Sequence, residues 1–232
     1  MKKIKSALIS VSDKSNLKPL LKTLKKNKIN LISSGGTFRI IKKLRFKCTE
    51  VSDYTGFKEI LDGRVKTLHP KIHSGILAKR NNKSHLKELK RNNFENIDLV
   101  IVNFYPFEKT IKMTNDKNKI IENIDIGGPA LVRAAAKNFN NVTVITSSSQ
   151  YAELINQLDK NNGSTSFEFR EKMSRLAFAE TAYYDSVISN YLNFKSNTNF
   201  PEKKIVYGNL IGKLRYGENP HQEGALYSKD KN

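Results

Sequence analysis

Residues 6–33 read SALISVSDKSNLKPLLKTLKKNKINLIS, and this stretch decides the fold. Residues 6–11 and 29–33 are short apolar runs between polar neighbours, a pattern typical of strands that are buried on both faces. Between these runs, the leucines of residues 17–24 recur at helical spacing. The stretch therefore predicts a strand, a helix and a second, parallel strand, which is the unit from which open parallel sheets are built.

The same alternation continues along the chain. Residues 99–103 and 142–146 are again short runs rich in Ile, Val and Leu, and residues 38–44 show a second helical repeat. We therefore expect an α/β fold with a doubly wound parallel sheet over residues 1–150.

Residues 151–232 show a different sequence pattern. Residues 168–192 show a long helical pattern with few breakers, so residues 151–195 are expected to add helices to the sheet. Residues 195–204, KSNTNFPEKK, are polar, contain Pro201 and are typical of a linker. Residues 205–232 are too few to hold a core of their own, so residues 196–232 are expected to form a separate terminal segment.

Composition places the chain among ordinary globular proteins. Its 232 residues, 38% apolar and 27% charged, exclude the collagen-like, disordered and disulfide-rich classes. The single cysteine, Cys48, excludes an internal disulfide and fits a reducing compartment. No apolar run approaches the length of a membrane span or of a signal peptide core, so we expect a cytoplasmic location and no membrane partner.

The net charge is high, with 41 Lys and Arg against 22 Asp and Glu, which gives +19. Of the cations, 32 are Lys and only 9 are Arg, and the lysines are scattered along the whole chain. Proteins that read nucleic acids favour Arg and interleave aromatic residues, and neither pattern is present. The charge therefore favours a phosphorylated metabolite as the partner and disfavours nucleic acid.

In open parallel sheets, ligands bind outside the carboxyl ends of the strands, so the residues after each predicted strand are candidates for a site. Ser12 and Lys14 follow the first strand. Ser34, Gly36 and Thr37, within the sequence SSGGT, follow the second and place hydroxyls and flexible glycines at a helix N-terminus, where anions bind. An ordinary helix cap is equally compatible with this segment, because the same residue types are preferred there.

Residues 62–70, DGRVKTLHP, strengthen the anion interpretation. Arg64, Lys66 and Thr67 place two cations and a hydroxyl within four residues of one predicted loop. Such a group, next to free helix N–H groups, suits a phosphate.

Two histidines follow this loop. His69 and His73 have the spacing of a zinc pair on a helix, but we expect Pro70 to disfavour a helix there, and no further ligands lie nearby in the sequence. We expect no metal site, and a structural or substrate-positioning role for His69.

Two further segments follow predicted strands or begin helices. Residues 103–107, NFYPF, carry Tyr105, which is either a core aromatic residue or a hydroxyl aimed into the crevice. Residues 124–138, IDIGGPALVRAAAKN, begin an Ala-rich helix with Gly-Gly-Pro, whose free N–H groups favour an oxyanion. Asp125 is either a helix cap or a group that acts on the ligand, and Lys137 is equally compatible with a solvated side chain at the helix end.

The motifs VSDK, SSGGT, DGRVKTLHPKIHSGIL, NFYPF, ENIDIGGPALVRAAAKN and FAETAYYD together resemble IMP cyclohydrolase, in which they occur in this order. This is the amino-terminal domain of the bifunctional AICAR transformylase/IMP cyclohydrolase family, and the resemblance covers residues 5–195. Residues 213–222, KLRYGENPHQ, resemble the opening of the transformylase half.

The resemblance implies a methylglyoxal-synthase-like doubly wound parallel sheet with additional C-terminal helices. It implies the dehydrative ring closure of 5-formamidoimidazole-4-carboxamide ribotide (FAICAR) to inosine 5'-monophosphate (IMP). The substrate's own carboxamide nitrogen attacks its formyl carbon, so no cofactor or metal is implied, and 10-formyltetrahydrofolate would serve only the transformylase half. The implied partners are the ribotide monophosphate and a second copy of the chain in a homodimer.

The resemblance also implies a role for each site residue. Lys66 would polarise the formyl oxygen, and Asp125 would orient or deprotonate the carboxamide. Lys137 and Tyr105 would complete the proton transfer. The residues implied to bind the substrate are Ser12, Lys14, Ser34, Gly36, Thr37, Arg64, Thr67, Val102, Asn103, Ile126 and Gly127. Arg215 and Tyr216 match ribotide-site residues of the transformylase half, yet they make no site alone.

The chain departs from the family pattern in length, because almost the whole transformylase half is missing. We therefore expect no formyl transfer by this chain. Two other functions stay open at this point: a methylglyoxal-synthase-type lyase that acts on a triose phosphate, and a basic nucleic-acid-binding module. Residues 124–138 argue against the first, and the scattered lysines argue against the second.

Overall fold

The computed structural model describes residues 1–196 and 200–229. The chain divides into two compact units, Met1–Thr181 and Ala182–Asn232. The domain boundaries expected at residues 150 and 195 stay predictions. Within the described residues, no helix combines the length and the apolar character that a membrane crossing requires.

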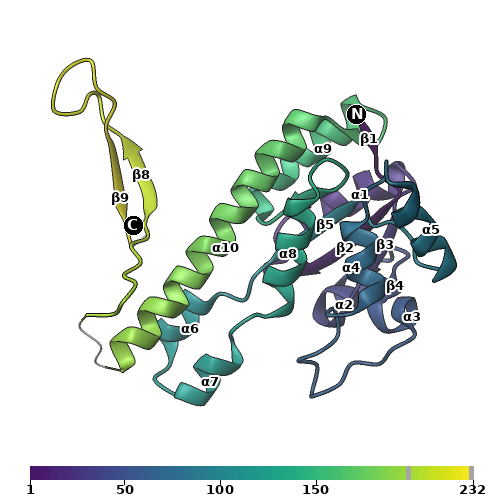
Figure 1. The fold of residues 1–232 in the computed structure, drawn as a ribbon, viewed down its shortest axis with the longest axis horizontal. Coiled ribbons are helices and arrows are strands. Elements are labelled where there is room, and N and C mark those ends of the chain that lie inside the picture. Colours follow the sequence, from purple (N-terminus) through teal and green to yellow (C-terminus); the bar gives the residue numbers. More distant parts are fainter. Residues whose placement is uncertain (197–199, 230–232) are drawn as a thin grey trace. The chain divides into compact units, whose positions relative to one another are not determined.

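The first unit is built on a five-stranded parallel sheet with the strand order β4-β3-β2-β5-β6 (Figure 1). The strands are β2 (Ser6–Val11), β3 (Asn30–Ser33), β4 (Thr49–Glu50), β5 (Leu99–Asn103) and β6 (Thr143–Ile145). The strands predicted at residues 6–11 and 99–103 are confirmed in full, and those at 29–33 and 142–146 are confirmed with slightly shorter ends. The short β4 lacks an apolar run and was not predicted, and neither was the antiparallel pair β1 (Lys2–Lys3) and β7 (Ser164–Thr165).

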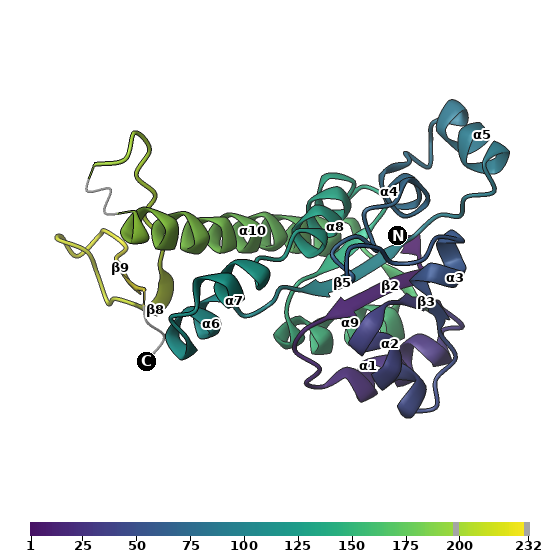
Figure 2. The same ribbon diagram turned by 90° about the horizontal axis from the view of Figure 1, so that it is seen from below.

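Helices connect the parallel strands and cover both faces of the sheet, as the predicted α/β fold requires. Figure 2 shows α1 and α9 on one face and α4 and α8 on the other. The helices of this unit are α1 (Leu17–Lys26), α2 (Gly35–Lys43), α3 (Val51–Thr55), α4 (Pro70–Leu77), α5 (Lys83–Arg91), α6 (Phe107–Met113), α7 (Lys117–Glu122), α8 (Gly127–Lys137) and α9 (Tyr151–Lys160), with the 3-10 turn η1 (Ser148–Gln150) before α9.

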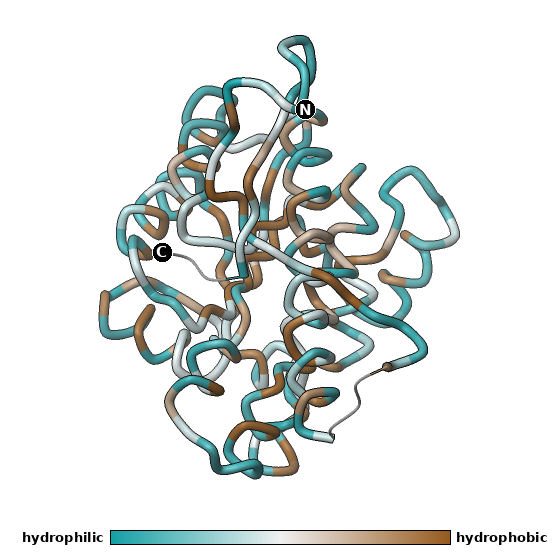
Figure 3. The backbone as a smooth tube through the Cα atoms, turned by 90° about the vertical axis from the view of Figure 1, so that its left-hand side faces the viewer, coloured by the Kyte–Doolittle hydropathy of each residue, from teal (hydrophilic) through white to brown (hydrophobic). Residues whose placement is uncertain are grey.

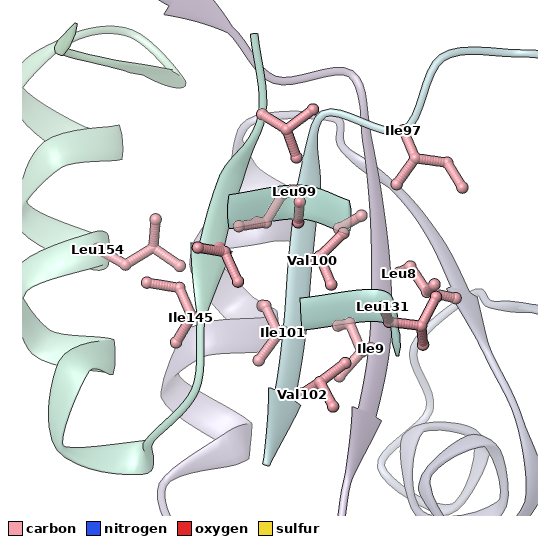
Figure 4. Packing of buried hydrophobic residues seen from close by; sticks show 14 of the residues in the cluster. Leu8, Ile9, Ile97, Leu99, Val100, Ile101, Val102, Leu131, Ile145 and Leu154 are labelled. Atoms are coloured by element: carbon pink, nitrogen blue, oxygen red, sulfur yellow. The ribbon is translucent and has the colours of Figure 1, made fainter. Parts of the chain in front are cut away.

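The core lies between the sheet and these helices. Strand β5 is buried along its apolar residues, and Figure 4 shows them in one cluster with Leu131 of α8, Ile145 of β6 and Leu154 of α9. The hydropathy colouring of Figure 3 shows the same pattern, with apolar residues along the central strands and polar residues in the connecting loops. Burial on both faces explains why these strands are near-continuous apolar runs.

The strand register places the carboxyl ends of the central strands at one edge of the sheet. Val11, the last residue of β2, pairs with Asn103, the last residue of β5. Ser33, the last residue of β3, pairs with Ile9 and donates a hydrogen bond from its buried hydroxyl to the Ile9 carbonyl oxygen at 2.6 Å. The segments that follow these strands therefore begin side by side.

Helix α10 (Phe167–Lys195) confirms the long helix predicted at residues 168–192. Its first turn belongs to the first unit and is anchored by the buried Arg170, whose guanidinium donates to the carbonyl oxygens of Phe139 at 2.8 Å and Thr165 at 2.7 Å. A buried guanidinium is tolerated because its donors are satisfied in this way.

The second unit consists of the end of α10 and the hairpin of β8 (Asn209–Lys213) and β9 (Ala225–Ser228). The apolar side chains of the hairpin, including Leu210, Leu226 and Tyr227, are exposed, as expected for a segment that holds no core of its own. Part of the predicted linker, residues 197–199, lies outside the described residues. Arg215 and Tyr216 lie exposed in the turn between β8 and β9.

Candidate active site

A cleft of about 620 Å³ opens at the carboxyl edge of the sheet, and its volume is in the usual range for a small-molecule site. Its walls come from the segments after β2, β3 and β5, from residues 62–67 and from the start of α8. The predicted site residues that line it are Ser12, Lys14, Ser34, Gly36, Thr37, Arg64, Lys66, Thr67, Asn103, Tyr105, Asp125, Ile126 and Gly127. The structure thus brings together residues that are spread over more than a hundred positions in the sequence.

Two predicted site residues of the first unit do not line the cleft. Val102 is fully buried in β5. Lys137 is the exposed last residue of α8, ten residues beyond Gly127, and a helix of that length spans about 15 Å. The proton-transfer role implied for Lys137 stays a prediction, which the geometry of a single chain does not support.

The first turn of α2 faces the cleft with unused donors. Ser34 is the N-cap residue, and the N–H groups of Gly35 and Gly36 have no hydrogen-bond acceptor among the described residues. Lys66 and Lys14 flank this turn, because a Cβ atom on Gly35 would lie 3.6 Å from Lys66 Nζ and one on Gly36 would lie 4.0 Å from Lys14 Cε. Lysine side chains beside a helix N-terminus favour an anion there, and the Lys14 ammonium also donates a hydrogen bond to Ser12 O at 2.9 Å.

Thr37 anchors this helix to the sheet. Its hydroxyl accepts a hydrogen bond from Val11 N at 3.0 Å and donates one to Val11 O at 3.0 Å, and the residue is buried. The side chain is therefore already engaged in the fold, so the backbone N–H of Thr37 is the group that remains for a ligand.

Replacement of Thr37 by Val is expected to lower the free energy of unfolding by about 1–3 kcal/mol. Val has a similar shape, but it leaves the buried Val11 N–H without an acceptor. Urea denaturation followed by circular dichroism measures the change, and Thr37→Ser, which keeps the hydroxyl, serves as the matched control. A Thr37→Val protein as stable as the parent would contradict this role.

Asn103 organises the loop after β2. Its Oδ1 accepts hydrogen bonds from Ser12 N at 2.6 Å and Asp13 N at 2.9 Å, and its Nδ2 donates to Asp13 O at 3.2 Å. The Asp13 carboxylate in turn accepts hydrogen bonds from Ser15 N and from the Ser148 hydroxyl, and these bonds hold the pKa of Asp13 below its usual value. Asn103 thus positions Ser12 at the cleft wall.

The start of α8 forms the opposite wall. Asp125 Oδ1 accepts a hydrogen bond from Gly128 N at 2.8 Å, so the carboxylate does cap the first turn. A Cβ atom on Gly127 would lie 2.7 Å from Thr67 Oγ1, and one on Gly128 would lie 2.5 Å from Asp125 Oδ2. A side chain at either glycine would therefore displace a polar group of the cleft.

Asp125 is only partly accessible to solvent, and its desolvation raises the pKa of the carboxyl group above its usual value. The backbone N–H groups of Gly128 and Tyr105 and the charge of Lys66 act in the opposite direction and offset part of the effect. A carboxylate with a raised pKa that faces a cleft is a candidate proton acceptor.

Both cations of residues 64–66 carry a carboxylate partner. Arg64 forms a two-point ion pair with Glu122, in which Arg64 Nε lies 3.2 Å from Glu122 Oε2 and Nη2 contacts Oε1. Lys66 Nζ lies 3.7 Å from Glu59 Oε2. Neither glutamate was predicted as a site residue. Glu59 belongs to no motif, and Glu122 is the first residue of ENIDIGGPALVRAAAKN, but only the fold brings the two side chains to this loop.

His69 has a structural role in this conformation. The expectation that Pro70 disfavours a helix is wrong: α4 begins at Pro70, because proline fits the first position of a helix, where no N–H bond is lost. His69 is the N-cap residue, and its Nδ1 accepts a hydrogen bond from Lys71 N at 3.1 Å. No cluster of three or more His, Cys, Asp or Glu side chains suited to a metal occurs in the part of the chain that the structure describes.

Comparison with known proteins agrees with this architecture. The MGS-like domain model matches residues 16–130, and the model of the AICARFT/IMPCHase bienzyme matches residues 135–232. A crystal structure of ForH superposes with a TM-score of 0.73 and 30% sequence identity, covering 82% of this chain and 99% of ForH. The parallel sheet, with its cleft at the carboxyl edge, is thus an MGS-like α/β domain.

Two relatives that match almost the whole chain specify the family within this class. The Bifunctional purine biosynthesis protein PurH of Persephonella marina is 52% identical over 225 residues, which cover 96% of this chain and 44% of the relative. PurH of Rhizobium johnstonii is 46% identical over 224 residues, which cover 97% of this chain and 42% of the relative. The chain belongs to the AICARFT/IMPCHase bienzyme family and matches the amino-terminal IMP cyclohydrolase half of PurH. It spans less than half the length of these two relatives.

Proposed function

We propose that this chain is an IMP cyclohydrolase, which closes the ring of FAICAR to IMP with loss of water. The observation that carries the proposal is the meeting of an anion site and a partly desolvated carboxylate in one cleft. The first turn of α2, with Lys14 and Lys66, suits the phosphate, and Asp125 stands at the start of α8. The cleft is large enough for a nucleotide-sized ligand.

The reaction needs little beyond positioning and charge stabilisation. The carboxamide nitrogen forms a bond to the formyl carbon and loses one proton. The formamido nitrogen loses a second proton as it forms a C=N bond to the same carbon, and the formyl oxygen takes up two protons and leaves as water when its bond to that carbon breaks. An amide nitrogen is a weak nucleophile, so a carboxylate that accepts or directs its proton promotes the attack. Asp125 is the group proposed for this role, and its raised pKa suits it.

Negative charge develops on the formyl oxygen as the new bond forms. Lys66, whose charge acts on Asp125, is proposed to stabilise this oxygen together with the N–H groups at the start of α8. Tyr105 lines the cleft and is 46% exposed, so its hydroxyl is accessible for proton transfer during the loss of water. No metal or cofactor takes part in the proposed mechanism, and formyl transfer from 10-formyltetrahydrofolate is not proposed for this chain.

The proposed partners are a ribotide monophosphate and a second copy of the chain, and the proposed location is the cytoplasm. A homodimer remains open to test by light scattering. Lys137 lies at the end of α8 that is distant from the cleft of its own chain. A role in proton transfer would therefore require it to reach a different cleft.

Incubation of the purified chain with FAICAR is expected to yield IMP, followed by its ultraviolet absorbance and by chromatography. A triose phosphate in the same assay tests the lyase alternative, for which the MGS-like fold alone would be sufficient. We expect no methylglyoxal from it. Folded protein that leaves FAICAR unchanged would overturn the proposal.

Thermal stabilisation by added ligands distinguishes the proposed function from the nucleic-acid-binding alternative. We expect IMP to raise the melting temperature, while an oligonucleotide at equal phosphate concentration does not. Protection by the oligonucleotide that disappears steeply with salt would instead support the basic binding module.

A further inference from the structure

We propose that Glu122 is an internal competitor for the phosphate site, because its carboxylate occupies Arg64 until the phosphate of a ligand displaces it. Arg64 and Glu122 lie 58 positions apart in the sequence, and both line the cleft. The contact is two-pointed, with Arg64 Nε and Nη2 each facing one carboxylate oxygen. This is the geometry in which arginine also binds a phosphate, so the two acceptors exclude each other.

The position of Glu122 in its own helix supports this role. It is the last residue of α7, where the helix dipole disfavours a negative charge. The N-cap of the same helix is Asp116, whose carboxylate accepts hydrogen bonds from Asn118 N and Lys119 N, so the helix does not depend on Glu122 for capping. Among the described contacts, the one that the Glu122 side chain makes is its ion pair with Arg64.

The strength of the pair suits a competitor that a ligand displaces. The side chains of Arg64 and Glu122 are 64% and 56% exposed, and exposed ion pairs are weak because water and salt screen them. A phosphate with two negative charges, which also reaches the first turn of α2, therefore replaces the carboxylate. Glu59 has a longer, single contact of 3.7 Å with Lys66 and is expected to compete less.

A competitor of this kind lowers the affinity for every ligand that uses Arg64 by one common factor. Under the proposed function, on which this consequence rests, substrate and product carry the same phosphate group. The competitor would therefore weaken the binding of both equally and would favour release of the product.

Calorimetric titration of the full chain with inorganic phosphate tests the inference without reference to catalysis. Glu122→Gln is expected to bind phosphate about three- to fivefold more tightly than the parent, as expected for loss of an exposed ion pair. Glu171→Gln makes the same change of net charge on an exposed position of α10 outside the cleft and is expected to have no such effect. The same three- to fivefold gain is expected for IMP.

A double-mutant cycle with Arg64→Ala separates direct competition for Arg64 from a general electrostatic effect of the Glu122 charge on phosphate binding. In the Arg64→Ala background, Glu122→Gln is expected to give no further gain in phosphate affinity. A gain that persists without Arg64, a Glu122→Gln protein that binds no more tightly than Glu171→Gln, or no phosphate binding by any variant would each overturn the inference. If the coupling appears but FAICAR is not converted, the competitor stands and the proposed function falls.

Discussion

Asp125→Asn is expected to lower kcat for FAICAR by about two to four orders of magnitude, with little change in KM. Asn keeps an oxygen that accepts the hydrogen bond from Gly128 N, so the start of α8 is preserved, but it accepts no proton from the carboxamide. Stopped-flow or steady-state absorbance measures the loss. Asp159→Asn, which removes an exposed carboxylate paired with Lys26, is the matched control and should leave kcat unchanged.

The pH dependence of the parent provides a second measurement of the same group. Because the pKa of Asp125 is raised, acidification protonates this carboxylate at a higher pH than it protonates an ordinary aspartate. We expect kcat to fall as pH drops through this raised pKa and the acid limb to vanish in Asp125→Asn. An unchanged acid limb in the variant would assign the proton acceptor to another residue.

The stability of Asp125→Asn shows whether its loss of activity comes from the missing carboxylate or from a destabilised fold. A carboxyl group whose pKa is raised by folding stabilises the folded state below its unfolded pKa, and that contribution is lost as pH rises through the folded pKa. At pH 7 the ionised Asp125 therefore disfavours the fold. We expect Asp125→Asn to be at least as stable as the parent at that pH.

Lys66→Ala is expected to lower kcat by about 10²- to 10³-fold, which is the effect of removing one stabilising group from a developing oxyanion. Phosphate affinity should fall less than tenfold, because Lys14, Arg64 and the first turn of α2 remain. Steady-state kinetics and phosphate titration measure the two effects separately. Lys58→Ala removes an exposed lysine of the same loop outside the cleft and serves as the control.

Equal losses in kcat and phosphate affinity would show that Lys66 acts on the phosphate alone. Lys66 is placed for either role, because it flanks the helix turn proposed for the phosphate and its charge also acts on Asp125. The ratio of the two losses therefore decides the role of this residue.

The central strands and the cleft edge were predictable because they depend on local pattern. Buried parallel strands are apolar throughout, and a rule about their carboxyl ends then groups the segments after β2, β3 and β5. The start of α4 at Pro70 was mispredicted, since proline both ends helices and begins them, and only the His69 cap distinguishes the two.

The rest of the site depends on tertiary contacts that no motif encodes. Glu122 reaches the cleft, and Glu59 reaches Lys66, only because α7 and residues 57–66 fold beside each other there. Lys137 is the opposite case. Its distance from Gly127 along an Ala-rich helix follows from the sequence alone, and helical rise already separates the two ends of α8.

The donors at the starts of α2 and α8 belong to the main chain, and this has a consequence for mutational scanning of the cleft. Replacing a side chain with alanine leaves every backbone N–H in place, so such a scan would underestimate how much of the affinity for an anion these turns supply. Backbone ester substitution at Gly36 or Gly127 is the chemical change that reaches them. It also follows that substitutions of surface side chains to lysine would leave these donors unchanged.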